Sequence, residues 1–427
     1  MSSKTAQAGD LAPIHSQRRR SILSRFLSHR LASAAVGRIC IVLPSGERIE
    51  QHGHETGPKA EIHIRQWSAL ARLFVGGYTG FARAYIAGEW FSPNVAAFFE
   101  WAACNDQHLD PAFSGAKVSQ LLDRLRHLRR ANTRNGSRRN ISAHYDLGNA
   151  FYALWLDAGM NYSSGIFAQS GQPLEHAQRS KIERATQLLD LKGRERVLEI
   201  GCGWGAMAEH LTSAHGCHVT GLTLSSEQRD FAVKRLISAG VKSITCIRLQ
   251  DYRDETAQYD RIISIEMLEA VGEAYWPVFF EKLRSCLKPG GVAVMQSITI
   301  AGSQFETYRR NPDFIQRYIF PGGMLPTIEL IRRHIETAGL SLRSIETFGQ
   351  SYALTLAAWR DRFQKAWPRA LQLGFDESFR RTWEYYLAYC EAGFRSELLD
   401  VGLYKIVRPG NADHVSRSLP LGAGNPQ

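Results

Sequence analysis

The sequence predicts an α/β protein in which a mostly parallel, doubly wound sheet follows a smaller α+β unit. From Val197 onward, short apolar runs alternate with segments of helical periodicity, which is the pattern of strands joined by helical crossovers. Before about residue 135, short alternating strands precede helices and an arginine-rich connector. With 427 residues, 44% of them hydrophobic, the chain can bury a sizeable core.

The smaller unit comes first along the chain. Residues 37–64 alternate apolar and polar positions between Gly and Pro breaks, as short strands do. Helical periodicity follows from Trp67 to about Trp101 and again from Val118 to about Leu128. The polar segment ANTRNGSRRN, residues 131–140, then marks a boundary between domains. The predicted organisation is a basic, flexible segment, an accessory domain, a larger domain and a flexible tail: residues 1–35, 36–135, 136–410 and 411–427.

Five strands are predicted in the larger domain, together with a helix after the first strand and two further helices with definite bounds. The run RVLEIGCGWG, Arg196 to Gly205, is predicted to be a buried strand that ends in a glycine-rich turn and opens a helix. One helix should run from Ser225, a suitable N-cap, to Ala239, and another from Ala274 to Cys286. The other strands are expected at 218–224, 244–251, 261–267 and 292–298. Ligands of such a parallel sheet bind at the carboxyl ends of its strands.

Positive charge is concentrated in the N-terminal third. Residues 1–140 hold 20 Lys and Arg against 10 Asp and Glu, which accounts for +10 of the total net charge of +11. Such clusters are often solvated helix faces, but they also suit nucleic acid or an anionic membrane surface. The aromatic stretch between Trp67 and Trp101 favours lipid contact or core packing over a nucleic-acid groove. We therefore expect a membrane surface, and no nucleic acid, as the partner of this region.

The cysteines and the apolar runs bear on location. Seven cysteines are scattered along the chain without a CxxC pair, which argues for reduced thiols and against a zinc site. No run approaches the roughly 18 apolar residues that a spanning helix needs. We therefore expect a cytoplasmic protein associated peripherally with the inner face of the membrane, and a homodimer remains an open alternative.

The glycine-rich turn GCGWG directly follows a strand whose acid is Glu199. It lacks the GxGxxG spacing of a dinucleotide site, and the chain has no P-loop motif. Its position matches the cofactor turn of Rossmann-like class I methyltransferases, where glycines let the backbone approach the methionine part of S-adenosylmethionine. The alternative is a tight turn without a ligand. The motif thus predicts S-adenosylmethionine as the cofactor.

Ten ordered segments between Asn140 and Pro409 resemble the cyclopropane-fatty-acyl-phospholipid synthases, a family similar to the mycolic acid cyclopropane synthases. They include HYDLGNAFYALWLD (144–157), VLEIGCGWG (197–205), EMLEAVG (266–272) and RYIFPGGMLP (317–326). The resemblance implies methyl transfer from S-adenosylmethionine to a cis double bond in an acyl chain of a membrane phospholipid, with a cyclopropane as the product. It also implies that the N-terminal unit is a lipid-associated domain.

The same resemblance implies a set of cofactor contacts. Tyr162 and Ser163 would cover the cofactor, and the three glycines of the turn would cradle its methionine part. The acid that usually holds the ribose is missing from the second strand, and TLSSEQ stands in its place. The implied contacts, including the acid before the turn, are Tyr162, Ser163, Glu199, Gly201, Gly203, Gly205, Thr223, Leu224, Ser225, Gln228, Gln250 and Asp251.

The chemistry implied by the resemblance sets further demands. Methylation of an olefin leaves positive charge on the chain, so the pocket must be dry and must offer aromatic faces or an anion. A base must then remove a proton from the new methyl group before a ring can close. The resemblance implies that this base is a bicarbonate ion. The residues that match its holders are Glu269, Gln296, Tyr352 and Ser164, with Gln296 in place of a His and Ser164 in place of a Cys.

These replacements leave the outcome of the reaction open. Gln and Ser still offer hydrogen bonds to an anion, so a cyclopropane is favoured. The alternatives are a methyl- or methylene-branched chain without a ring, a non-catalytic lipid-binding relative, and a methyltransferase for small molecules or tRNA. Cys390 matches a cysteine that is often given a catalytic role. A thiolate would trap a carbocation, so a buried packing role for Cys390 is an equal alternative.

Overall fold

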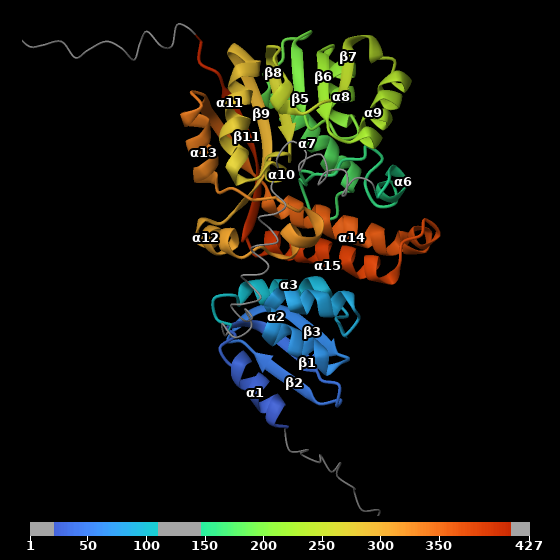
Figure 1. Ribbon diagram of the computed structural model, residues 1–427, viewed down its shortest axis with the longest axis vertical. Coiled ribbons are helices and arrows are strands. Elements are labelled where there is room, and N and C mark those ends of the chain that lie inside the picture. The colour runs from blue at the N-terminus through green and yellow to red at the C-terminus, as the bar shows by residue number, and fades with distance from the viewer. Residues whose placement is uncertain (1–20, 110–146, 411–427) are drawn as a thin grey trace, which may run out of the picture.

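The computed structural model describes residues 21–109 and 147–410 of the chain. These residues form two α/β units, one with a seven-stranded sheet and one with a four-stranded sheet. Two long helices, α14 (Gly349–Gln372) and α15 (Glu377–Arg395), lie between the two sheets (Figure 1). The helix expected over residues 118–128, the boundary near residue 135 and the polar, arginine-rich segment of residues 131–140 lie outside the described residues.

The larger sheet has the strand order β10-β11-β9-β8-β5-β6-β7. Neighbouring strands from β9 to β7 are parallel, whereas β11 is antiparallel to both β9 and β10. The prediction of a mostly parallel, doubly wound sheet is therefore confirmed. Its strands are β5 (Arg196–Ile200), β6 (His218–Thr223), β7 (Thr245–Leu249), β8 (Tyr259–Ile265), β9 (Leu287–Ile300), β10 (Ser341–Thr347) and β11 (Leu399–Val407).

Different helices cover the two faces of this sheet. Because successive side chains of a strand point to opposite faces, Leu198 packs with α11 and α13, whereas Val197 packs with α7, α8 and α9. Ile262 and Ile263 divide in the same way. Burial on both faces explains the continuous apolar runs that predicted these strands. The helices are α7 (Leu174–Leu188), α8 (Ala206–His215), α9 (Ser226–Ser238), α11 (Trp276–Cys286) and α13 (Ile328–Thr337).

The two helices predicted with definite bounds form with small changes at their first turns. Helix α9 begins after Ser225, whose Oγ accepts the backbone N–H of Gln228 at 3.2 Å. Helix α11 begins at Trp276 because the three residues before it form a 3-10 turn. The remaining elements of the larger unit are α6 (Asn149–Tyr152), α10 (Leu268–Val271), α12 (Gly302–Arg310), the 3-10 turns Lys242–Ile244, Tyr252–Asp254 and Glu273–Tyr275, and a π-helical turn, Ile315–Ile319.

The smaller sheet has the order β2-β1-β3-β4. Three strands form where alternation predicted them, but the helical stretch predicted from Trp67 to Trp101 is divided. A short strand interrupts it, and Trp90 of that strand pairs with Ile64. The elements of this unit are α1 (Ile22–Leu31), β1 (Val36–Val42), β2 (Arg48–His52), β3 (Glu55–Ile64), α2 (Trp67–Ile86), β4 (Trp90–Phe91) and α3 (Val95–Cys104).

Aromatic side chains join the two units along α15. The ring centroid of Tyr385 lies 4.6 Å from that of Phe99 in α3 and 5.6 Å from that of Tyr85 in α2. Tyr389 lies 5.6 Å from Phe99. One hydrophobic cluster consequently contains residues of both units. Within residues 21–109 and 147–410, no helix is both long and apolar enough to cross a bilayer.

Candidate active site

The glycine-rich turn lies at the carboxyl end of β5, in the middle of the parallel strands. Gly201, Gly203 and Gly205 have φ angles of 81°, 50° and 83°, which other residues rarely adopt. A Cβ on Gly205 would lie 2.9 Å from the Cβ of Ala232, so this glycine lets α9 pack closely. A Cβ on Gly203 would meet no atom of the described residues within 4 Å. The backbone at Gly203 is therefore open to the adjoining cleft.

A cleft of about 180 Å³ begins at this turn, and most of the predicted cofactor residues line it. Gly205 and Ser225 do not line it but begin α8 and α9 as N-caps. The predicted residues that line the cleft are Tyr162, Ser163, Glu199, Gly201, Gly203, Thr223, Leu224, Gln228, Gln250 and Asp251. The fold thus gathers into one cleft residues that are as much as 89 positions apart, from Tyr162 to Asp251.

Two basic residues of the cleft were not predicted from the sequence. The Nζ atom of Lys181 donates to Oγ of Ser163 at 2.8 Å. The Arg253 guanidinium donates to both carboxylate oxygens of Asp251, at 2.9 and 2.6 Å. Both basic residues line the cleft. Lys181 lies within α7, where an amphipathic pattern gives no sign that one lysine is buried against a ligand site.

Glu199 provides a test of whether the cleft suits the predicted cofactor. Its side chain is buried, and its Oε2 atom has no hydrogen-bond partner among residues 21–109 and 147–410. Burial raises the pKa of Glu199 to about 8, although Lys181 opposes this shift. A cationic ligand in the cleft would favour the ionised form of this buried carboxyl group and give its unpaired oxygen a partner. The residues present therefore fit S-adenosylmethionine, whose amino and sulfonium groups are cationic.

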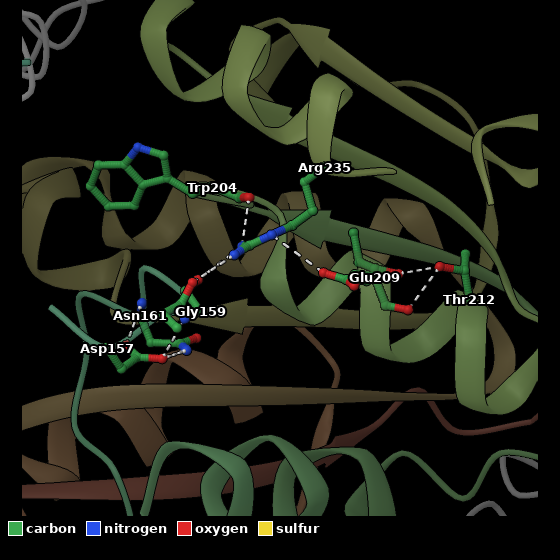
Figure 2. A network of polar contacts seen from close by, with 9 residues as sticks. Asp157, Gly159, Asn161, Trp204, Glu209, Thr212 and Arg235 are labelled. Carbon is green, nitrogen blue, oxygen red and sulfur yellow. Dashed lines mark hydrogen bonds and ion pairs between the residues drawn. The ribbon is translucent and has the colours of Figure 1, made fainter. Parts of the chain in front are cut away.

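The segment that carries Tyr162 and Ser163 is shaped by Asp157. The Asp157 carboxylate accepts the backbone N–H of Gly159 at 2.9 Å and that of Asn161 at 2.8 Å (Figure 2). The Asn161 side chain donates to the same carboxylate at 2.8 Å. These bonds hold a tight turn directly before the two residues that line the cleft.

Arg235 of α9 ties this turn to the glycine-rich turn. Its Nη1 atom donates to the carbonyl oxygens of Gly159, at 2.8 Å, and Trp204, at 3.0 Å (Figure 2). Its Nε atom lies 3.3 Å from Oε2 of Glu209 in α8. One guanidinium thus links the two backbone segments on either side of the cleft to α8 and α9.

Glu266 lies directly after β8 and was not predicted as a site residue. Its Oε1 accepts the backbone N–H of Ser164 at 2.8 Å and Nε2 of Gln296 at 2.7 Å. Its Oε2 accepts the phenol of Tyr352 at 2.6 Å. The three residues that were predicted to surround an anion together with Glu269 therefore converge on Glu266. The Ser164 hydroxyl takes no part, since it donates to the carbonyl of Gly165 at 2.8 Å.

Glu269 has a different set of partners. Its Oε1 accepts hydrogen bonds from the Ser297 hydroxyl, at 3.0 Å, and from the backbone N–H of Ile298, while its Oε2 has no partner in the part of the chain that the structure describes. Burial, together with the nearby negative charge of Glu266, raises the pKa of Glu269 to about 8. Glu269 is therefore mostly protonated at neutral pH, unlike an ordinary carboxyl group.

A second cavity of about 560 Å³ meets the cofactor cleft at this point. Its lining is mainly apolar and includes Leu31 and Ile62 of the smaller unit as well as Phe314 of the larger one. Three residues line both the cavity and the cleft: Tyr162, Glu266 and Ala270. A group carried in the cleft and a chain held in the cavity would therefore meet beside Glu266.

Cys390 lines the larger cavity, where none of the described residues stabilises a thiolate. Burial raises the pKa of its thiol far above the usual range, and the negative charge of Asp313 adds to the shift. The group is therefore a thiol and not a thiolate at neutral pH. Its place fits the alternative that the sequence left open, an apolar packing role beside the site.

The fold and the site define a Rossmann-like, S-adenosylmethionine-dependent methyltransferase. Residues 132–403 match the family described as "Mycolic acid cyclopropane synthetase". Tuberculostearic acid methyltransferase UfaA1 of Mycobacterium tuberculosis is 38% identical over 367 residues, 83% of this chain and 84% of that protein. Cyclopropane-fatty-acyl-phospholipid synthase of Escherichia coli K12 is 33% identical over 352 residues, 82% of this chain and 87% of that protein.

Solved structures lead to the same family. Cyclopropane synthase MmaA2 of Mycobacterium tuberculosis matches with a TM-score of 0.60 and 30% identity, covering 63% of this chain and 98% of that one. CmaA1 in complex with SAH and CTAB matches with a TM-score of 0.60 and 29% identity over the same shares. The chain belongs to the mycolic acid cyclopropane synthetase family, and methylation of lipid acyl chains is the chemistry of that family.

Proposed function

We propose that this protein transfers the methyl group of S-adenosylmethionine to a cis double bond in an acyl chain of a membrane phospholipid, and that the product is a cyclopropane. The observation that carries the proposal is the junction of the apolar cavity with the cofactor cleft beside Glu266. The cavity volume of about 560 Å³ is in the usual range for a pocket that encloses a ligand. An acyl chain in it would present its double bond to the methyl group.

Aromatic side chains at the junction support this chemistry. S-adenosylmethionine, when bound, supplies the methyl group and leaves positive charge on the acyl chain. The Tyr162 ring lies at the junction, with its phenol 2.8 Å from that of Tyr386 and its ring centroid 5.4 Å from that of Trp359. Ring faces stabilise cations, and the apolar lining excludes the water that would capture one.

The lengths of the matches favour a phospholipid over a mycolic acid. Hydroxymycolate synthase MmaA4 aligns with 64% of this chain and 93% of its own length. The phospholipid synthase aligns with 82% of this chain, a length that the methyltransferase domain alone cannot supply. The smaller unit therefore has a counterpart in the phospholipid synthase, and this unit supplies part of the cavity wall.

The outer surface of the smaller unit suits a bilayer. Ile22 and Phe26 of α1 are 81% and 39% exposed, and Val75 of α2 is 64% exposed. The rings of Phe26 and Phe74 lie 5.8 Å apart, so the two helices present these side chains side by side. Leu27 of α1 and Leu73 of α2 line the cavity from the other side. We infer that α1 and α2 dock on an anionic membrane and admit the acyl chain.

A product without a ring is the second candidate. It is favoured by the 38% identity to UfaA1, a relative whose name gives methyl transfer and no cyclopropane. Loss of a different proton from the cation, or its reduction by a partner, would give a methylene- or methyl-branched chain.

The test is incubation of the protein with labelled S-adenosylmethionine and monounsaturated phospholipid vesicles, followed by analysis of the fatty esters. A labelled cyclopropane ester supports the proposal, and a labelled branched ester without a ring contradicts its last step. Flotation with anionic vesicles tests the membrane surface. The triple substitution of Ile22, Phe26 and Val75 by Ser should reduce binding about tenfold or more, given the apolar area removed. Undiminished binding would contradict the assignment of this surface.

A further inference from the structure

Glu266 has a backbone conformation that requires an explanation. Its φ angle is 48°, in the left-handed region that glycine adopts freely and other residues rarely do. Keeping a glutamate there costs about 1 kcal/mol or more, and such strain concentrates at functional sites. The conformation directs the carboxylate to the point where the cofactor cleft and the lipid cavity meet.

The residues that donate hydrogen bonds to this carboxylate are those that the family resemblance assigned to a bound bicarbonate ion. The backbone N–H of Ser164, the amide of Gln296 and the phenol of Tyr352 all donate to it, at 2.6 to 2.8 Å. Gln296 is fully buried, and so is Ser164. The nearby N–H of Ile298 is bonded to Glu269. Since these donors are already engaged by side-chain carboxylates, a bicarbonate ion would have to displace one of them.

We propose that the Glu266 carboxylate is the general base of this active site and occupies the position of the external bicarbonate ion. The proposal rests on the proposed function, because it assigns the base for the same methyl transfer to an olefin. It makes proton removal independent of dissolved bicarbonate. It also explains how the site can dispense with the histidine and the cysteine that Gln296 and Ser164 replace.

The charges of the two acids agree with this assignment. Burial raises the pKa of Glu266, whereas its three hydrogen bonds and Lys181 favour its ionised form. Glu269 lacks such donors on Oε2 and has a pKa of about 8. Two acids in unlike surroundings divide into one ionised and one protonated group. Glu266 is therefore the acid able to accept a proton, and its raised pKa makes it a stronger base than an exposed carboxylate.

The reaction step balances with this residue alone. When the new C–CH₃ bond forms from the olefin electrons, S-adenosylhomocysteine leaves and the neighbouring carbon becomes cationic. Glu266 takes one proton from the new methyl group, and the electrons of that C–H bond form the third bond of the ring. The neutral carboxylic acid then returns its proton to water after the product leaves.

The first test needs no turnover. Sodium bicarbonate is titrated calorimetrically into the wild-type protein, Glu266→Gly and the control Glu281→Gln, whose side chain is exposed on α11. Glycine at position 266 relieves the backbone strain and frees the three donors, so Glu266→Gly should bind bicarbonate saturably. The wild type and the control should bind at least about tenfold more weakly, which corresponds to 1.4 kcal/mol. Equal binding to all three proteins would overturn the proposal.

The second test follows the product in carbon-dioxide-free buffer with and without added bicarbonate. The wild type and Glu281→Gln should form the same product in both. Glu266→Gln should form it about 100-fold more slowly in both, with unchanged S-adenosylmethionine affinity. Glu266→Gly should regain activity only with bicarbonate. A wild type that requires bicarbonate, or a fully active Glu266→Gln, would overturn the proposal. A wild type that methylates no unsaturated phospholipid would contradict the proposed function, while the titration would still decide where bicarbonate binds.

Discussion

At the scale of single residues, two glutamates three positions apart lie beside the cavity and have unlike surroundings. Glu266 receives three hydrogen bonds, and Glu269 receives two on one oxygen and none on the other. Hydrogen bonds favour the ionised form of Glu266 against the burial that raises its pKa, whereas the pKa of Glu269 is raised to about 8, so Glu266 is the better placed of the two to carry a negative charge. One charge beside the junction can balance the cation that forms there without a second buried anion.

Tyr352→Phe tests how much its phenol contributes to positioning this anion. The variant removes the 2.6 Å hydrogen bond to Glu266 and leaves the ring, which stacks on Phe394 at 4.4 Å. We expect product formation to fall about 10- to 100-fold, since a buried carboxylate that has lost the partner of its Oε2 atom is less firmly positioned and more easily protonated. Calorimetry should give an S-adenosylmethionine affinity within about threefold of the wild type. Wild-type turnover would show that the phenol is dispensable.

Glu269 should also affect stability as pH changes. Its pKa is about 8 in the folded protein and 4.5 in an exposed state, so the folded state holds a proton that the unfolded state loses. Its contribution to stability is thus fully present below about pH 4.5 and is lost as the pH rises to about 8.

Denaturant unfolding between pH 5 and 8 measures this effect. The free energy of unfolding should fall by on the order of 1 kcal/mol per pH unit from this group, and Glu269→Gln should flatten the slope. An unchanged slope in the variant would show that Glu269 has an ordinary pKa. Glu281→Gln, which alters an exposed acid, provides the matched control.

At the scale of elements, helix α9 is a support for the cofactor cleft. Arg235→Met should loosen the turn of residues 157–161, because it removes the guanidinium hydrogen bonds to Gly159 and Trp204. We expect the S-adenosylmethionine affinity to weaken about 5- to 20-fold, and the unfolding temperature to fall a few degrees for a loss of about 1–3 kcal/mol.

Lys234→Met is the control for that substitution, because Lys234 is exposed on the same helix. Calorimetric titration of both variants with S-adenosylmethionine measures whether Arg235→Met alone loses affinity. Equal affinities would show that the contacts of Arg235 are of no consequence for the cleft.

The same scale shows what the sequence could predict. The strands and the glycine turn were predictable because both faces of the sheet are buried and because the turn needs glycine. The sequence could not predict which acid of EMLEAVG, Glu266 or Glu269, receives the hydrogen bonds of the site, because the resemblance pointed to Glu269. Which acid meets the donors depends on the φ angle at Glu266 and on Gln296 and Tyr352, which lie 30 and 86 positions away. No local pattern encodes contacts of that range.

The sequence also did not predict how far the cavity extends into the smaller unit. Residues 37–64, which hold most of β1 and β3, were predicted only as short strands of an accessory unit. In the structure some of them, such as Ile41 and Ile62, also form the wall of a cavity that reaches Glu266. Docking of α15 on α2 and α3 produces this arrangement, and sequence periodicity does not report which two apolar faces will meet.

At the scale of the whole molecule, the smaller unit should influence which acyl chains are accepted. Ile62→Phe adds volume to the wall of the cavity, whereas Ile49→Phe makes the same change at a buried site that does not line it. Each should cost about 1–3 kcal/mol of stability. Only Ile62→Phe should lower turnover of long acyl chains relative to shorter ones, measured on vesicles of defined chain length. Parallel behaviour of the two variants would place the acyl chain elsewhere.

The contact of α15 with the smaller unit has one more consequence. Tyr385 and Phe99 lie at the wall of the apolar cavity as well as between the two units. Separation of the units would therefore wet the cavity while leaving the cofactor cleft intact. Methyl transfer could still occur, but water would capture the cation and yield a methyl-branched alcohol. A closed interface between the units would thus keep water from the cation. Hydroxylated fatty acids among the products would indicate that the units had separated.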